Sequence, residues 1–102
     1  LFRSEELRRV DLVFSCAKSE DVRRVQDLMV EVMNEDANVI KEPEPFARVS
    51  GGTNEAVEYT VRAWCKSEDY WTVYFDLNQH IVEKLAANGV AAPAARVLVE
   101  QK

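Results

Sequence analysis

Apolar residues follow two spacings along this chain, and each spacing predicts a different element. Two segments alternate in side-chain character from one residue to the next, as β-strands do: residues 10–17 and 57–65. A short strand is predicted at residues 46–50, and the β-rich residues 96–99 predict a final one. Two segments repeat apolar residues every three or four positions, as helices with one buried face do: residues 19–34 and 68–87. The order predicts an α+β fold, a ferredoxin-like β-α-β-β-α-β sandwich with both helices on one sheet face.

A short sequence occurs twice where a strand passes into a helix. Lys18-Ser19-Glu20-Asp21 is identical to Lys66-Ser67-Glu68-Asp69, 48 residues later (66 − 18). The serine in each copy is a predicted helix N-cap, and the two acidic residues favour the positive end of the helix dipole. Apolar helix positions coincide at the same offset, for example Val25 and Val73. The chain therefore reads as two similar β-α halves.

The faces of the sheet are less clear, although strands one and three are expected to be parallel neighbours. One alternative places four residues under the helices: Val13, Ser15, Val61 and Ala63. It leaves five on the open face: Leu12, Phe14, Cys16, Arg62 and Trp64. The reverse alternative exposes a different set: Val57, Tyr59 and Val61. Either way large apolar groups face outward, which predicts that another subunit or domain covers them.

Proline and glycine mark the connections between these elements. Pro43 and Pro45 exclude helix from residues 37–45, and Gly51-Gly52-Thr53-Asn54 predicts a hairpin turn. Gly89 supplies a residue for the left-handed position after the second helix. The expected division is a linker at 1–9, a ferredoxin-like domain at 10–89 and a C-terminal extension or barrel strand at 90–102.

Composition excludes several classes of protein. The 102 residues, 47% hydrophobic and 30% charged, suit one globular domain, and a net charge of −5 argues against nucleic-acid binding. No apolar run approaches the ~20 residues of a membrane helix, and no signal peptide is visible. Two cysteines outside any C-x-x-C pair predict reduced thiols in a cytoplasmic setting. Because the chain starts at Leu1 and not at Met, we expect it to be part of a longer protein.

Candidate chemistry is sparse. His80 is the only histidine, and no nucleophile or carboxylate is indicated beside it, so a packing or surface role is predicted. The repeat aligns Cys16 with Trp64 and not with Cys65, which predicts thiols on opposite faces and neither a disulfide nor a metal site. Gly51-Gly52 lacks the lysine and helix of a phosphate loop. We therefore expect no enzyme activity, no cofactor and no metal.

Aromatic residues gather around the second strand-to-helix junction: Trp64, Tyr70, Trp71, Tyr74 and Phe75. Trp71 and Phe75 lie four residues apart, away from the apolar stripe through Val73 and Leu77. The second helix thus has two apolar sides, and only one can face its own sheet. The other predicts an interface.

Several segments together resemble one family. They are Arg8-Arg9-Val10-Asp11-Leu12-Val13 leading into Ser19-Glu20-Asp21-Val22, then Ile40-Lys41-Glu42-Pro43-Glu44-Pro45, then Val61-Arg62-Ala63-Trp64, and Asp69-Tyr70-Trp71-x-Val73-Tyr74-Phe75-Asp76-Leu77. In order and spacing they resemble the carboxy-terminal cytoplasmic α/β domain of the small-conductance mechanosensitive channel (MscS) family. The resemblance covers nearly the whole chain.

The resemblance implies a structural role without catalysis. In that family a homoheptamer forms a tension-gated membrane pore, its α/β domains build a perforated cytoplasmic chamber, and each last strand joins a parallel β-barrel. The implied function is a cytoplasmic vestibule domain that frames solute portals when hypo-osmotic shock opens the channel, in a parent protein of the inner cell membrane. The expected subunit-interface residues are Arg62, Trp64, Trp71, Phe75, Arg96, Val97, Leu98 and Val99. The alternative is a stand-alone ferredoxin-like regulatory module that binds a small ligand, with residues 51–54 as its candidate loop.

Overall fold

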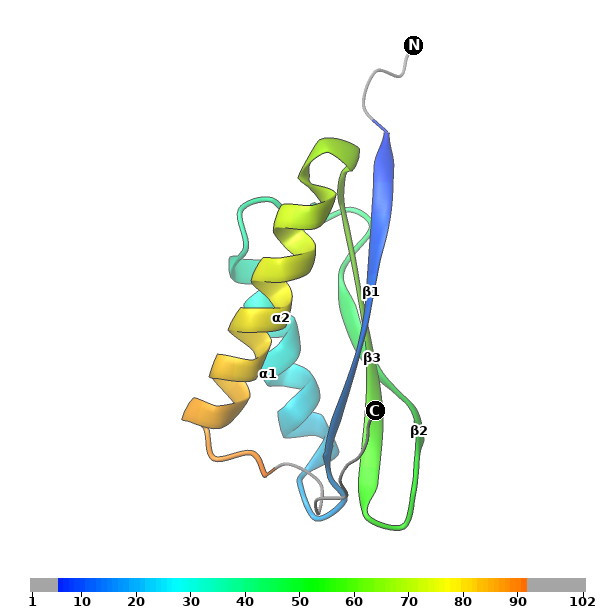
Figure 1. Ribbon diagram of the computed structural model, residues 1–102, viewed down its shortest axis with the longest axis vertical. Coiled ribbons are helices and arrows are strands. Elements are labelled where there is room, and N and C mark those ends of the chain that lie inside the picture. The colour runs from blue at the N-terminus through cyan, green and yellow to red at the C-terminus, as the bar shows by residue number, and fades with distance from the viewer. Residues whose placement is uncertain (1–5, 92–102) are drawn as a thin grey trace, which may run out of the picture.

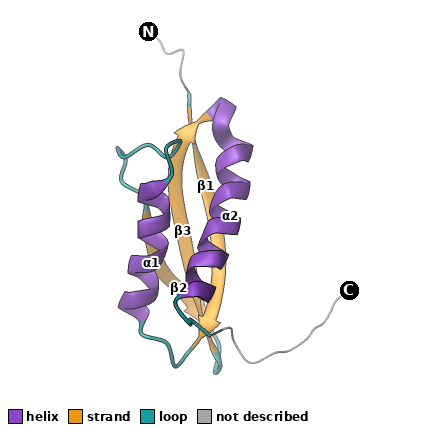
Figure 2. Cartoon of the chain, turned by 90° about the vertical axis from the view of Figure 1, so that its left-hand side faces the viewer, coloured by secondary structure: helices purple, strands orange, loops and turns teal. Residues whose placement is uncertain are grey.

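The alternating and helical segments form a two-layer fold, seen in a computed structural model that describes residues 6–91. The elements are β1 (Leu7–Ala17), α1 (Val22–Glu35), β2 (Phe46–Gly52), β3 (Ala56–Lys66), a short 3-10 helix η1 (Ser67–Asp69) and α2 (Tyr70–Ala87). The sheet has the order β1-β3-β2, and both helices cover one of its faces (Figure 1, Figure 2). The predicted α+β fold is confirmed. The expected strand at residues 96–99 lies outside the described residues.

All neighbouring strands are antiparallel, so the expectation that the first and third strands run parallel is wrong. β1 pairs with β3 antiparallel, with Val10 opposite Ala63 and Phe14 opposite Tyr59. β2 pairs with β3 antiparallel as well. The reason is topological: α1 returns the chain so that β2 runs parallel to β1, and the β2–β3 hairpin then reverses it.

Both expected assignments of the sheet faces are also wrong in part. Opposed residues of an antiparallel pair share a face, so the register puts Leu12 and Val61 together under the helices. Val13, expected there in one alternative, is 62% exposed on the open face. Tyr59 and Val61, expected on the open face in the other, are fully buried. The open face does carry Arg62 and Trp64, as the first alternative expected.

The helices bury the stripes that their spacing predicts. Four residues of α2 and four of α1 are buried against the sheet: Val73, Leu77, Ile81, Leu85, Val25, Met29, Val32 and Met33. Burying one such side chain fully contributes roughly 1.5–3 kcal/mol. Within residues 6–91, the buried core residues are all apolar, although one of them, Tyr59, carries a polar hydroxyl group.

The repeated tetrapeptide adopts two different structures, and neither serine caps its helix as predicted. At α1 the cap is Asp21, whose Oδ1 accepts hydrogen bonds from the backbone N–H of Arg23 at 3.0 Å and of Arg24 at 3.4 Å. In the second copy Ser67 opens η1, and its backbone N–H donates to the carbonyl of Glu6 at 2.9 Å. At the other end of α2, Gly89 has φ +72°, which confirms the predicted left-handed stop.

The β2–β3 hairpin turns tightly after Gly52. A Cβ on this residue would lie 2.6 Å from the carbonyl oxygen of Ala56, so only glycine fits the approach. Thr53 Oγ1 then accepts hydrogen bonds from the backbone N–H of Glu55 and of Ala56, both at 3.2 Å. The hairpin predicted around residues 51–54 is therefore present, with its turn one residue later.

Candidate functional site

The outward side of α2 carries large apolar residues, which we call the outer ridge: Trp71, Phe75 and Val82. Their side chains are 58%, 62% and 56% exposed. At about 100° per residue, Trp71 and Phe75 lie opposite the buried stripe through Val73 and Leu77, and they form the second apolar side that the sequence predicts for this helix. Val82 lies closer to the sheet, where it lines a hollow with Phe14 and Cys16 of β1.

Neighbouring rings hold the aromatic part of the outer ridge in place. Trp71 stacks on Phe75 with ring centroids 5.9 Å apart, and it meets Tyr70 and Tyr74 edge-on at 4.9 Å and 5.3 Å. The guanidinium carbon of Arg8 lies 3.8 Å from the ring centroid of Tyr70, within cation–π distance. An ordered aromatic surface loses less conformational entropy on binding, so this end of α2 is suited to a packed contact.

The other large surface is the open sheet face, formed by the outward residues of the three strands. Trp64 and Phe46 lie at one end of it with ring centroids 6.2 Å apart, and Arg48 approaches the Phe46 ring at 5.5 Å. Asp11 forms ion pairs with Arg9 at 2.8 Å and with Arg62 at 3.4 Å. Arg62 Nε makes the second contact without hydrogen-bond geometry, and it has no hydrogen-bond partner among residues 6–91.

The structure separates the predicted interface residues into two groups. Arg62 and Trp64 lie on the open sheet face, whereas Trp71 and Phe75 lie on the outer ridge, beyond the helix layer. The remaining predicted interface residues, Arg96, Val97, Leu98 and Val99, lie outside the described residues. The two groups therefore cannot meet within one copy of the chain.

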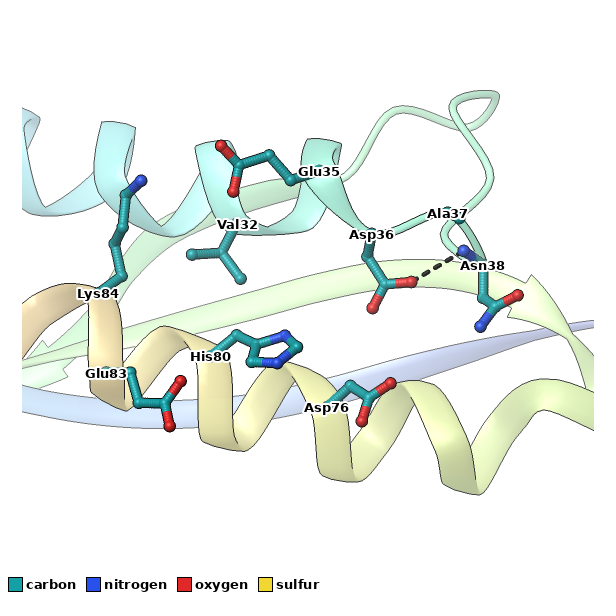
Figure 3. A pocket seen from close by; sticks show the side chains of 9 residues that line it. All are labelled: Val32, Glu35, Asp36, Ala37, Asn38, Asp76, His80, Glu83 and Lys84. Atoms are coloured by element: carbon teal, nitrogen blue, oxygen red, sulfur yellow. Dashed lines mark hydrogen bonds between the residues drawn. The ribbon is translucent and has the colours of Figure 1, made fainter.

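Sequence reasoning missed a hollow of about 660 Å³ between the end of α1 and the middle of α2 (Figure 3). Its lining residues are Val32, Glu35, Asp36, Ala37, Asn38, Asp76, His80, Glu83 and Lys84. The spacing Asp76, His80, Glu83 places three polar groups on one flank of α2, which was the available signal. The hollow also needs the carboxylates that end α1, and only the fold brings these to the same place.

The chemistry of the hollow is limited. Asp36 Oδ1 accepts a hydrogen bond from the backbone N–H of Asn38 at 2.8 Å. Lys84 forms an ion pair with Glu31, and the hydrogen bond that it donates to this carboxylate raises the pKa of the lysine. Across residues 6–91, no three His, Cys, Asp or Glu side chains come close enough to hold a metal ion. His80 is exposed at the rim. The hollow thus supplies negative charge and no catalytic set.

The two thiols are far apart, but not for the predicted reason. Cys16 and Cys65 are both buried on the helix-covered face, which corrects the expectation of opposite faces. Since β1 and β3 are antiparallel, Cys16 lies opposite Val57, eight residues from Cys65 along β3 (65 − 57), or roughly 26 Å. Burial is the main cause that raises the pKa of each thiol, so both are protonated at neutral pH.

Neither α1 nor α2, nor any other helix within residues 6–91, is both long and apolar enough to cross a bilayer.

Comparisons with known proteins agree with this fold. A family profile described as "Mechanosensitive ion channel MscS, C-terminal" matches residues 10–92. The small-conductance mechanosensitive channel of Edwardsiella ictaluri is 27% identical over 90% of this chain and 32% of its own length. An uncharacterized MscS family protein of Synechocystis is 31% identical over 84% of this chain and 29% of its own length. The chain thus spans about a third of these relatives.

Solved structures show the same fold. Helicobacter pylori MscS in its closed state superposes with a TM-score of 0.81 and 23% identity, covering 94% of this chain and 38% of that one. Arabidopsis thaliana MSL1 superposes with a TM-score of 0.75 and 13% identity, covering 92% and 35%.

Proposed function

Since this chain belongs to the MscS family of mechanosensitive ion channels, whose C-terminal domain it matches over residues 10–92, we propose that it is a cytoplasmic vestibule domain. The family is one of channels and not of enzymes. The parent protein would lie in the inner cell membrane and open under tension on hypo-osmotic shock. This domain would frame the portals through which ions and small solutes pass.

The exposed apolar surfaces are the observation that carries this proposal. Trp71 and Phe75 are each more than half exposed on one side of the domain, and Val13 is exposed on the other. A monomeric domain rarely keeps such groups in water on two sides, whereas a ring subunit meets a neighbour on each side. Assembly into a homo-oligomer, a heptamer by analogy with the family, would bury them. The assembly residues proposed within the described chain are Arg62, Trp64, Trp71 and Phe75.

The division of the chain follows from the same proposal. Residues 1–9 would lead in from the upstream part of the parent, with residues 7–9 already paired in β1. Residues 10–89 would form the vestibule domain, and residues 90–102 would extend to the base of the chamber. There Arg96, Val97, Leu98 and Val99 would join an intersubunit β-barrel.

Osmotic shock tests this function in cells. The parent gene is expressed in a bacterium that lacks its own mechanosensitive channels, and survival of hypo-osmotic shock is measured together with patch-clamp currents under membrane tension. We expect improved survival and a tension-gated current. A parent protein that reaches the membrane and gives neither would refute the channel function. Saturable binding of a metabolite by the isolated chain would then favour the regulatory-module alternative.

A further inference from the structure

We propose that the free edge of β1 is a strand-addition site, and that its occupant in an unassembled copy is the chain's own C-terminal segment, residues 92–102. This segment lies outside the described residues. It would add a fourth strand, antiparallel to β1, and cover an apolar hollow beside that strand. The pairing itself is independent of the proposed function, whereas its later release into an intersubunit β-barrel rests on that function.

The edge of β1 is long and regular. β1 lies at one side of the sheet, beside α2 (Figure 2). It has 11 residues and pairs with β3 without a bulge, whereas β2, at the opposite edge, has seven residues and a register shift after Val49. Short or bulged edge strands discourage further pairing, and a long regular one invites it. The edge of β1 therefore needs a partner more than the edge of β2 does.

The backbone groups on this edge can be assigned from the bonds at the two ends of the strand. Lys18 N–H donates to the carbonyl of Glu55 at 3.1 Å, and Ser67 N–H donates to the carbonyl of Glu6 at 2.9 Å. Both bonds cross to the β3 side, so even-numbered positions along β1 face β3. Odd-numbered residues then point their N–H and C=O groups to the free edge: Arg9, Asp11, Val13 and Ser15.

The chain already makes the first hydrogen bond along this edge. After α2 it turns back, and Ala17 N–H donates to the carbonyl of Ala91 at 3.0 Å. Glu20 Oε2 accepts a hydrogen bond from the Ala91 N–H at 3.0 Å, which holds the last described residue beside the end of β1. The 11 residues that follow Ala91 (102 − 91) equal β1 in length. Extended, they would reach along the whole strand, about 36 Å.

Continuing the antiparallel pairing from this bond gives a definite register. Glu100 falls opposite Arg8, and a carboxylate opposite a guanidinium favours the pairing. Pro93 falls opposite Ser15, where its carbonyl can accept a hydrogen bond but it has no N–H to donate. The ladder therefore loses one bond at that position, which an edge strand tolerates.

The same register fills space beside the strand. An apolar hollow of about 270 Å³ lies between β1 and the last turns of α2, and its lining includes Phe14, Cys16, Val82, Leu85, Val90 and Ala91. Val82 is 56% exposed there. Ala92 and Ala94 would lie opposite Cys16 and Phe14, on the face that the helices cover, so their methyl groups would close the hollow. Arg96 would lie opposite Leu12, where the long side chain of an edge arginine keeps its guanidinium in water.

Edge pairing and barrel formation exclude each other, because both use residues 96–99. In an unassembled copy the C-terminal segment protects the edge of β1 from pairing with other chains. Assembly of the parent would exchange this pairing within one chain for pairing between subunits. The segment thus keeps an unassembled subunit from associating through its exposed edge.

Hydrogen exchange followed by NMR on the 102-residue chain tests the edge pairing. Three amide protons that face the free edge should exchange roughly 100-fold more slowly than in an unstructured peptide: Asp11, Val13 and Ser15. Ala95 would lie opposite Val13, so Ala95→Pro removes an N–H from the ladder and should speed exchange of the Val13 amide about tenfold or more. Ala94→Pro is the matched control, because the N–H of Ala94 points away from β1. The Leu12 amide faces β3 and should stay protected in every variant.

Two results in these spectra would overturn the proposal. They are fast exchange of the three edge amides in the wild-type chain, and equal exchange rates of the Val13 amide in the two proline variants. Protection that increases with protein concentration would overturn it as well, because the occupant of the edge would then be a second copy. We expect exchange rates that do not change on dilution.

The outcome is separable from that of the proposed function. Slow, concentration-independent exchange at the edge, with no tension-gated current from the parent, would refute the channel function alone. A tension-gated current from the parent, with fast exchange at the edge of the separate chain, would refute the edge pairing alone.

Discussion

Removing the hydroxyl of Tyr59 should stabilise this domain. Tyr59 lies in the middle of β3, opposite Phe14, and its side chain is fully buried under the helices. Its hydroxyl finds no hydrogen-bond partner among residues 6–91. Burial is also the main cause that raises the pKa of this phenol, followed by Cys16, Glu20 and Asp21. The substitution Tyr59→Phe removes the oxygen and keeps the ring.

The magnitude follows from the cost of burying an unpaired polar group. The hydroxyl is hydrated in the unfolded chain, and burying it without a partner costs about 1–3 kcal/mol. Losing the packing contacts of one oxygen atom offsets part of this gain. We therefore expect Tyr59→Phe to raise the free energy of unfolding by about 1 kcal/mol, which corresponds to roughly 4–8 °C in Tm for a domain of this size.

Thermal and urea unfolding, both followed by circular dichroism, provide the assay. The m-value should not change, because the area exposed on unfolding stays nearly the same. Tyr74→Phe is the control, since Tyr74 is only half-buried, and it should change stability by less than about 0.5 kcal/mol. A loss of 1 kcal/mol or more in Tyr59→Phe would show that the hydroxyl has a partner and that the reasoning is wrong.

Four further predictions concern stability. Leu77→Ala should cost about 2–5 kcal/mol in urea unfolding, because Leu77 is fully buried. Asp21→Ala should cost about 1 kcal/mol by removing the side-chain cap of α1, whereas Asp21→Asn should cost much less. Gly89→Ala should cost about 1 kcal/mol in the same assay, since its φ is +72° and no atom lies near enough to clash. Burial raises the pKa of Cys16 and of Cys65 above the ordinary 9.0. The stability that these protonated thiols contribute should therefore be complete below pH 9.0 and be lost as the pH rises through their folded-state pKa values. Replacing both cysteines with Ala should make the fall of Tm above pH 9.0 less steep.

The helices could be predicted from the sequence because their spacing allows one solution. In α2 the residues Val73, Leu77 and Ile81 recur on one side, and all three are fully buried. The outer ridge followed from the same spacing, since Trp71 and Phe75 fall on the opposite side. A 3.6-residue period fixes the direction of each side chain, so both the core side and the exposed side of this helix were accessible to sequence analysis.

The faces of the sheet could not be predicted in the same way. β1 contains Val10, Leu12 and Phe14 on one side and Val13 on the other, so apolar residues occur with both parities. Which alternate residues of β1 face the helices is determined only by the register of β1 with β3. That register depends on strand direction, which the connections through α1 and the hairpin determine and the local pattern does not. The predicted face of Cys16 was wrong for this reason.

The repeated tetrapeptide shows how tertiary contacts override a local signal. Ser19 and Ser67 have identical neighbours from Lys to Asp, yet Asp21 caps α1 while Asp69 makes no side-chain cap at α2. The difference lies outside the repeat: the Ser67 backbone N–H is bound by the carbonyl of Glu6, just before β1 begins. A cap contributes only about 1 kcal/mol, which one competing backbone hydrogen bond can match.

The positive charge of the open sheet face is likewise a product of the register. Arg9, Arg48 and Arg62 belong to three different strands and are far apart in the sequence. They share a face because Arg62 lies opposite both Asp11 and Phe46, and Arg48 lies opposite Thr60. A shift of one residue in either ladder would turn one strand's arginine toward the helices, where a buried charge is costly. The ladder that buries Val61 and Ala47 therefore also assembles the cationic surface on the open face of the sheet.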